Sequence, residues 1–148
     1  MYKRQIQGDA PKTALLDAFR ADGSGILVAT MGFWEGVDVP GDALRLVILD
    51  KLPFAVPTDA VVRARAAALE AEGRDPFACY TVPEAAITLK QGVGRLLRTT
   101  KDRGVVALFD RRLVERGYGK RIRRELPLGP PTSDLDAVRA FFGVVAVS

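Results

Sequence analysis

The sequence predicts an α/β fold built on a mostly parallel sheet. Three apolar runs, residues 25–29, 44–49 and 104–109, read as strands without the polar alternation of a half-exposed sheet. Helical patterns separate these runs, as they do where crossover helices join parallel strands. We therefore expect a sheet covered by helices on both faces. Three strands make a thin sheet, so we also expect a strand to be missing upstream of Asp9 and the chain to be truncated at its start.

The helices are predicted from their caps and apolar spacing. Asp9 is expected to cap the first helix, with Pro11 in its first turn and Gly23 at its end. Thr58 and Asp59 begin an alanine-rich helix, and Pro83 begins a helix that extends through Arg98. The expected helices cover residues 9–22, 59–72, 83–98, 110–117, 119–125 and 134–142.

Composition excludes several classes of protein. The 148 residues suit one domain, and the absence of histidine rules out histidine-based zinc sites and acid–base catalysis. Cys79 is the single cysteine, so an internal disulfide is excluded, and we expect this residue in the core. No apolar run of about 18 residues and no signal peptide are visible, which predicts no membrane partner.

Positive charge is concentrated in the last third of the chain. The net charge is only +4, so the clustering is more informative than the total. Such a cluster suits a phosphate backbone, but solvated helix faces carry similar charge, and both interpretations stay open. The cationic residues are Lys101, Arg103, Arg111, Arg112, Arg116, Lys120, Arg121, Arg123 and Arg124.

A glycine-rich segment after the first apolar run is the first candidate site. In open α/β sheets, ligands bind beyond the carboxyl ends of the strands, which is where residues 29–41 (ATMGFWEGVDVPG) fall. Glycines allow a ligand to approach the backbone closely. Thr30 is a candidate to reach a phosphate, and Asp38 to accept a hydrogen bond from a ribose hydroxyl. A glycine-rich connection with Trp34 as packing is the alternative.

The second candidate site is QGVGRLLR, residues 91–98. Gln91, Gly94, Arg95 and Arg98 recur at the spacing of one helix face. The opposite stripe is apolar and is expected to pack on the sheet; it comprises Ala86, Leu89, Val93 and Leu96 or Leu97. Two glycines inside a helix cost about 1 kcal/mol each relative to alanine, and guanidinium groups bind phosphate oxygens bidentately. The pattern favours a phosphate-facing site over an ordinary amphipathic helix.

These two stretches resemble a known family. ATMGFWEGVDVPG is similar to motif V of the DinG/XPD-like group of superfamily 2 helicases, and QGVGRLLR resembles motif VI. LDKLPF (residues 49–54) lies between them, and VVALFDRR (residues 105–112) follows, in the order that the group shows. The resemblance implies a RecA-like, three-layer αβα domain. It assigns residues 9–148 to the second RecA-like domain and residues 1–8 to a leader outside the family or to a truncated start of the domain.

The resemblance also implies an ATPase motor in which ATP lies between two RecA-like domains. Arg98 then corresponds to the arginine finger and Arg95 to its catalytic neighbour. Gln91 and Gly94 stand beside these arginines in the ATP-binding set, together with Glu35, Gly36 and Asp38 of motif V. Mg²⁺ and most of the ATP contacts are expected from the first domain.

On the same basis, the nucleic-acid-binding set comprises Thr30, Met31, Gly32 and Phe33, with single-stranded DNA as partner. The chain contains no G-x-x-x-x-G-K-[ST] phosphate loop, so we expect it to be inactive without the first RecA-like domain. An iron–sulfur cluster, which many members bind through first-domain cysteines, is conceivable in a longer protein but is not assigned here. The resemblance implies a bacterial cytoplasmic protein that acts at the nucleoid.

Two other functions stay open. One is a stand-alone module that binds single-stranded nucleic acid through the basic last third, without catalysis. The other is a self-sufficient nucleotide-utilising enzyme, which the missing phosphate loop disfavours.

Overall fold

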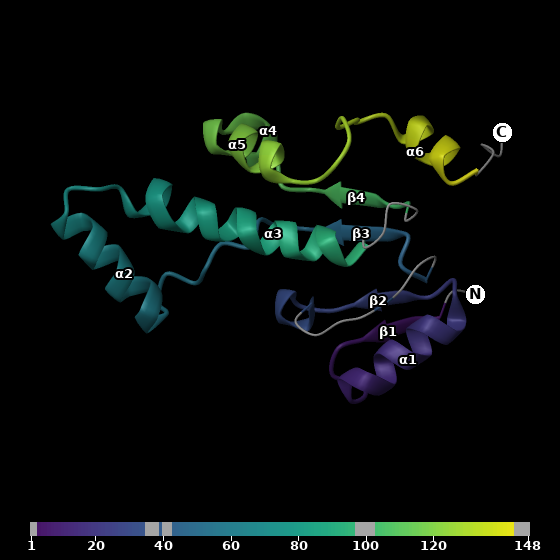
Figure 1. The fold of residues 1–148 in the computed structure, drawn as a ribbon. Coiled ribbons are helices and arrows are strands. Elements are labelled where there is room, and N and C mark those ends of the chain that lie inside the picture. The colour runs from purple at the N-terminus through teal and green to yellow at the C-terminus, as the bar shows by residue number, and fades with distance from the viewer. Residues whose placement is uncertain (1–2, 35–38, 40–42, 97–102, 144–148) are drawn as a thin grey trace.

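The computed structural model describes residues 3–34, 39, 43–96 and 103–143 (Figure 1). Its strands form two parallel pairs, β1 (Arg4–Ile6) with β2 (Ile26–Val28) and β3 (Leu46–Leu49) with β4 (Val105–Leu108). In Figure 1 the four arrows are stacked in the order β4, β3, β2, β1 and point the same way. The carboxyl ends of the strands therefore lie on one side of the molecule. The parallel α/β class predicted from the sequence is confirmed.

One strand was missed. The expectation that no strand precedes the first helix is wrong, because Arg4–Ile6 pairs in register with Ile26–Val28. Arg4 is exposed and the buried residue of the strand is a glutamine, Gln5, so the run lacks the continuous apolar character of the other strands. The domain boundary predicted after residue 8 falls two residues after the end of this strand.

The helices agree with the predicted pattern within a few residues at each end. The helix start expected at Asp59 is confirmed, and two aspartates cap the helices that follow them. Asp59 accepts hydrogen bonds from the backbone N–H groups of Val61 and Val62 at 2.8 and 3.1 Å, and Asp134 caps the last helix. The cap assigned to Asp9 is wrong, because Pro11 occupies that position without a side-chain hydrogen bond. The bounds are α1 Lys12–Asp22, η1 Met31–Trp34, α2 Ala60–Ala71, the π-helical turn η3 Phe77–Thr81, α3 Val82–Leu96, α4 Arg112–Glu115, α5 Gly117–Glu125 and α6 Leu135–Phe141.

Two groups of buried side chains hold these elements together. The larger group joins β3 to α3, α4 and α5 through residues such as Leu49, Leu89 and Ile122. The smaller group joins α1 to the segment after β2 through Leu16, Phe19 and Phe33. Burial of apolar surface in these two groups is the main force that positions α3 and η1 against the strands.

The sequence predicted helices on both faces of the sheet, but the described helices leave one face of β2 and β3 exposed. Alternate apolar residues of β2 and β3 are 43–56% exposed: Ile26, Val28, Leu46 and Ile48. Their neighbours Leu27, Val47 and Leu49 contact the two cores. The described helices therefore cover only one face of these two strands.

The prediction that Cys79 lies in the core is wrong, because the residue is exposed on η3. None of the described helices is long and apolar enough to span a bilayer.

Candidate nucleotide and nucleic-acid interface

Helix α3 separates an apolar stripe from a polar one. Ala86, Leu89 and Val93 are at most 2% exposed and pack in the larger core. Gln91 and Gly94 are exposed on the other side of the helix. The segregation predicted for QGVGRLLR is confirmed for these five residues. A Cβ atom added at Gly94 would meet no atom within 4 Å, so an open surface lies over this part of the backbone.

The remaining members of the ATP-binding set are only partly placed. Arg95 belongs to α3, but its side chain is outside the description. Arg98, Glu35, Gly36 and Asp38 lie outside the described residues. Their roles stay predictions that rest on the resemblance.

Thr30 is positioned by a residue that the sequence did not single out. The Oε1 atom of Gln7 accepts hydrogen bonds from the backbone N–H and from the hydroxyl of Thr30, at 2.8 and 3.0 Å. The backbone N–H of Gln7 in turn donates to the carbonyl of Val28 at 2.9 Å. Gln7 therefore links the end of β1 to the end of β2 and orients the exposed threonine. No local sequence signal marks this contact, because it joins residues that are 23 positions apart.

The other predicted nucleic-acid residues differ in accessibility. Gly32 is exposed, and a Cβ atom added there would meet nothing within 4 Å. The ring of Phe33 is only 5% exposed and packs with α1, with the Lys12 ammonium 5.0 Å from its centroid. A nucleic-acid contact at Phe33 would therefore use its backbone. Met31 lies in η1, and its side chain is outside the description.

A buried carboxylate joins the carboxyl ends of β3 and β4. Asp110 follows β4, and its side chain is only 8% exposed. It accepts hydrogen bonds from the backbone N–H of Leu52 at 2.8 Å and from that of Arg112 at 3.0 Å. The Arg112 guanidinium donates to both carboxylate oxygens, Nε to Oδ1 at 2.9 Å and Nη2 to Oδ2 at 2.5 Å. The segment after β3 is thereby tied to the segment after β4.

This arrangement fixes the charges of both groups. Hydrogen bonds from Arg112 hold the pKa of the Asp110 carboxyl well below its usual range; burial opposes this effect, and the backbone N–H groups of Leu52 and Arg112 reinforce it. The hydrogen bonds to Asp110 raise the pKa of the Arg112 guanidinium above its ordinary value. The guanidinium carbon of Arg112 lies 5.0 Å from the ring centroid of Phe54, so the ion pair also stacks against the loop after β3.

Comparison with known proteins identifies the family that has this architecture. The family model described as the helicase C-terminal domain matches residues 1–129. The chain belongs to the helicase C-terminal domain family. The strand pairs, the amphipathic α3 and the RecA-like fold that the two motifs implied all agree with this membership. The match begins at residue 1, so it includes β1.

Individual relatives of this helicase C-terminal domain come from several bacteria. The chain is 51% identical over 136 residues to "ATP-dependent DNA helicase YoaA" of Haemophilus influenzae, covering 92% of this chain and 21% of that protein. It is 42% identical over 134 residues to "ATP-dependent helicase DinG" of Mycobacterium tuberculosis, covering 90% and 20%. It is 39% identical over 122 residues to "3'-5' exonuclease DinG" of Bacillus subtilis, covering 82% and 13%. The chain spans about a fifth or less of these relatives.

Proposed function

We propose that this chain is the second motor domain of an ATP-dependent DNA helicase, which couples ATP hydrolysis to movement along single-stranded DNA. The observation that carries the proposal is the two-sided character of α3. Its apolar stripe is fully packed in the core, while Gln91 and the unobstructed backbone of Gly94 face outward. Two helicases among the relatives share this region at 42–51% identity.

In this proposal the nucleotide lies between α3 and a first RecA-like domain. Arg98 acts as the arginine finger that stabilises charge on the transferred phosphoryl group, with Arg95 beside it. Gln91, Gly94, Glu35, Gly36 and Asp38 complete this domain's contribution to the ATP cleft. The first domain would hold most of the ATP and the Mg²⁺; ATP would supply the phosphoryl group, and Mg²⁺ would neutralise charge on the phosphate oxygens.

The proposed DNA path runs over the carboxyl ends of the strands. Thr30 and Gly32 are exposed there, next to the end of β2. Between Asp110 and Glu125 the chain carries seven cationic residues and three anionic ones, a balance that favours a phosphate backbone. The protein would then act in the bacterial cytoplasm, at the nucleoid.

A chimaera tests the catalytic role. The matched segment of the Haemophilus influenzae helicase is replaced by this chain, so that a nucleotide-binding first domain is present. Arg98→Ala is expected to lower ATP hydrolysis by roughly 10³–10⁵-fold, while ATP binding changes little. Arg139→Ala, at an exposed ion pair with Asp136 on α6, is the matched control and should leave hydrolysis unchanged.

The result separates the two functions that the sequence left open. Near-normal hydrolysis in the Arg98→Ala chimaera would remove this arginine from the mechanism. If the isolated chain also bound single-stranded DNA without any effect of ATP, the stand-alone binding module would become the better description.

A further inference from the structure

A hollow opens between α2 and the body of the domain, at the carboxyl ends of β3 and β4. Its volume is about 820 Å³, within the range of roughly 300–1,000 Å³ that small-molecule sites occupy. The residues that line it come from α2, from the loop after β3, from η3, from the start of α4 and from the start of α5. The segments on either side of α2 in the sequence therefore meet the starts of α4 and α5, which come much later in the chain, around one space.

Three aromatic rings form one wall of this hollow. Phe54 and Phe77 lie 5.6 Å apart between centroids, and Tyr118 lies 6.0 Å from Phe54 and 5.2 Å from Phe77. The rings are tilted or edge-on to one another, which is the preferred geometry of an aromatic cluster. Phe77 is nevertheless 41% exposed. Part of this aromatic surface is thus available to a ligand.

The opposite wall is formed by α2, which packs poorly against the body. None of its 12 residues is buried, although Ala60, Ala64 and Ala67 line the hollow. Figure 1 shows α2 extending away from the strands. The side of α2 that faces the body therefore exposes apolar surface to the hollow.

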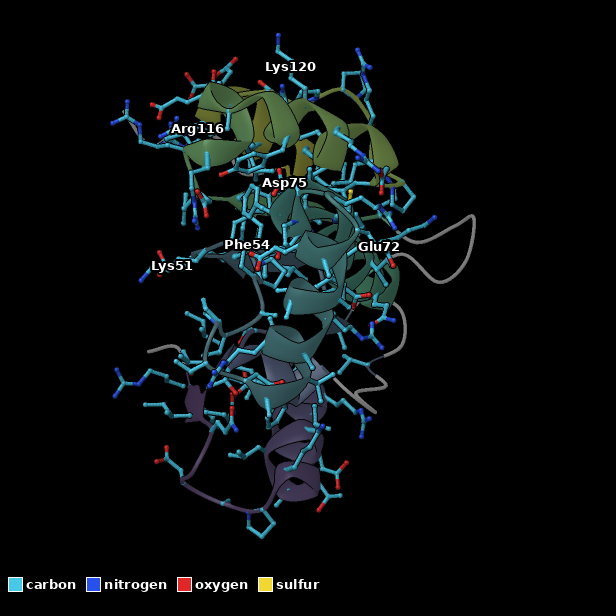
Figure 2. The ribbon with its side chains drawn as sticks, turned by 90° about the vertical axis from the view of Figure 1, so that its left-hand side faces the viewer. Lys51, Phe54, Glu72, Asp75, Arg116 and Lys120 are labelled. Carbon is cyan, nitrogen blue, oxygen red and sulfur yellow. The ribbon has the colours of Figure 1, made fainter. Side chains whose placement is uncertain are left out.

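The charged residues of the lining favour an anionic ligand. Arg63 and Arg112 contribute guanidinium groups, against the carboxylate of Glu70. Arg112 is held in place by Asp110 and stacks on Phe54. Figure 2, viewed from the carboxyl-end side, shows Lys51 and Arg116 on the left side of the molecule, Lys120 at its top and Glu72 on the right. Flat rings beside guanidiniums suit a base that is attached to phosphates.

We propose that this hollow binds an unstacked base of single-stranded DNA against Phe77 and Phe54, with Arg63 on the adjoining phosphate. The proposal deepens the function proposed above and rests on it. Phe54 and Arg112, which line the hollow, follow β3 and β4 as Thr30 follows β2, and the parallel strands end on the same side of the molecule (Figure 1). It continues the proposed DNA path along the edge of the strands.

The hollow is separate from the proposed nucleotide cleft. Phe77 precedes the first turn of α3, whereas Gln91 and Gly94 lie in its last turns. A helix rises about 1.5 Å per residue, so roughly 20–25 Å separates the hollow from the proposed ATP contacts. One nucleotide could not occupy both places.

Binding of short oligonucleotides by the chain tests the proposal. Fluorescence anisotropy would compare a labelled single-stranded thymidine oligonucleotide with a base-free deoxyribose-phosphate strand of the same length. Phe77→Ala is expected to weaken binding of the thymidine strand by roughly 5- to 150-fold, the usual effect of losing one stacked base. Binding of the base-free strand should change little. Arg63→Ala should lower the salt dependence of binding by about 0.7 in log–log slope, as expected for one phosphate contact.

Phe141→Ala is the matched control. Phe141 is likewise 41% exposed and belongs to α6, where it stacks with Arg103 outside the hollow. Thymidine binding that is equal in Phe77→Ala, Phe141→Ala and the unaltered chain would overturn the base site and leave the helicase proposal standing. Absence of any single-strand binding at low salt would contradict the DNA path itself. A third outcome is that the chain forms a dimer, that Phe77→Ala dissociates this dimer, and that DNA binding is unchanged. The hollow would then bind a second copy of the chain, which would also overturn the proposal.

Discussion

The Oδ2 atom of Asp110 lies 2.8 Å from the backbone nitrogen of Leu52, a residue 58 positions earlier in the chain. This hydrogen bond links the loops that follow two neighbouring parallel strands, β3 and β4. The loop after β3 carries Phe54, and the segment after β4 carries Arg112, which stacks on that ring. One buried carboxylate therefore sets the relative position of the aromatic wall and of the guanidinium beside it.

Asp110→Asn is expected to destabilise the fold by roughly 1.5–3 kcal/mol, the usual contribution of a hydrogen bond to a charged group. The amide keeps the shape of the side chain but loses the charge that holds Arg112. Asp136→Asn is the control, because Asp136 forms an exposed ion pair with Arg139, and such pairs contribute about 0–1 kcal/mol. Chemical denaturation of both variants measures the difference. Equal stability of the two would show that the Asp110 hydrogen bonds contribute little.

The stabilisation by Asp110 is also expected to depend on pH. Because its pKa in the folded state lies below the unfolded value of about 3.9, the carboxylate stabilises the fold fully above pH ~4. That contribution is lost as pH falls below this value and through the folded pKa. The stability gap between the unaltered chain and Asp110→Asn should therefore narrow under acid. A gap that stays constant from neutral pH to pH ~2 would contradict this assignment.

The two glycines at the start of α5 are expected to respond differently to alanine. A Cβ atom at Gly119 would lie 2.5 Å from the backbone oxygens of Arg112 and Leu113, whereas one at Gly117 would meet nothing within 4 Å. The Gly119 contacts are with backbone, so α4 and α5 would have to separate. Gly119→Ala should destabilise by about 1–3 kcal/mol and Gly117→Ala by much less. Thermal unfolding of the two variants tests this close approach, which equal melting temperatures would refute.

Gly94→Ala is expected to separate stability from function. The added methyl group meets no atom of the chain, and alanine is favoured over glycine inside a helix by about 1 kcal/mol. The variant should therefore be more stable. In the chimaera it should also bind ATP more weakly, because the methyl group would occupy the surface proposed for the nucleotide. A stabilised variant with unchanged ATP affinity would remove Gly94 from the proposed cleft.

Much of the local structure follows from short-range sequence signals. The cap at Asp59, the end of α1 at Gly23 and the two-sided α3 were predictable, because each depends on residues within one or two helical turns. The fold class was predictable for a similar reason, since apolar runs alternate with helices. The cap predicted at Asp9 was wrong because Pro11 occupies the N-cap position of α1. The predicted burial of Cys79 was wrong because η3 lies at the surface. A single apolar side chain in a short turn gives no signal of which side faces the core.

The sequence by itself thus determined the class of fold, the order of its elements from α1 on apart from the short turns η1 and η3, and the two segments that resemble helicase motifs. Only the tertiary structure decided which side chains of those segments are accessible. It buries the ring of Phe33 against α1, assigns Gln7 to hold Thr30, and assembles Phe54, Phe77 and Tyr118 around one hollow. The physical reason is the range of the contacts. Helical periodicity and caps act over a few residues, whereas these contacts form only after parallel strands have brought distant segments to the same edge.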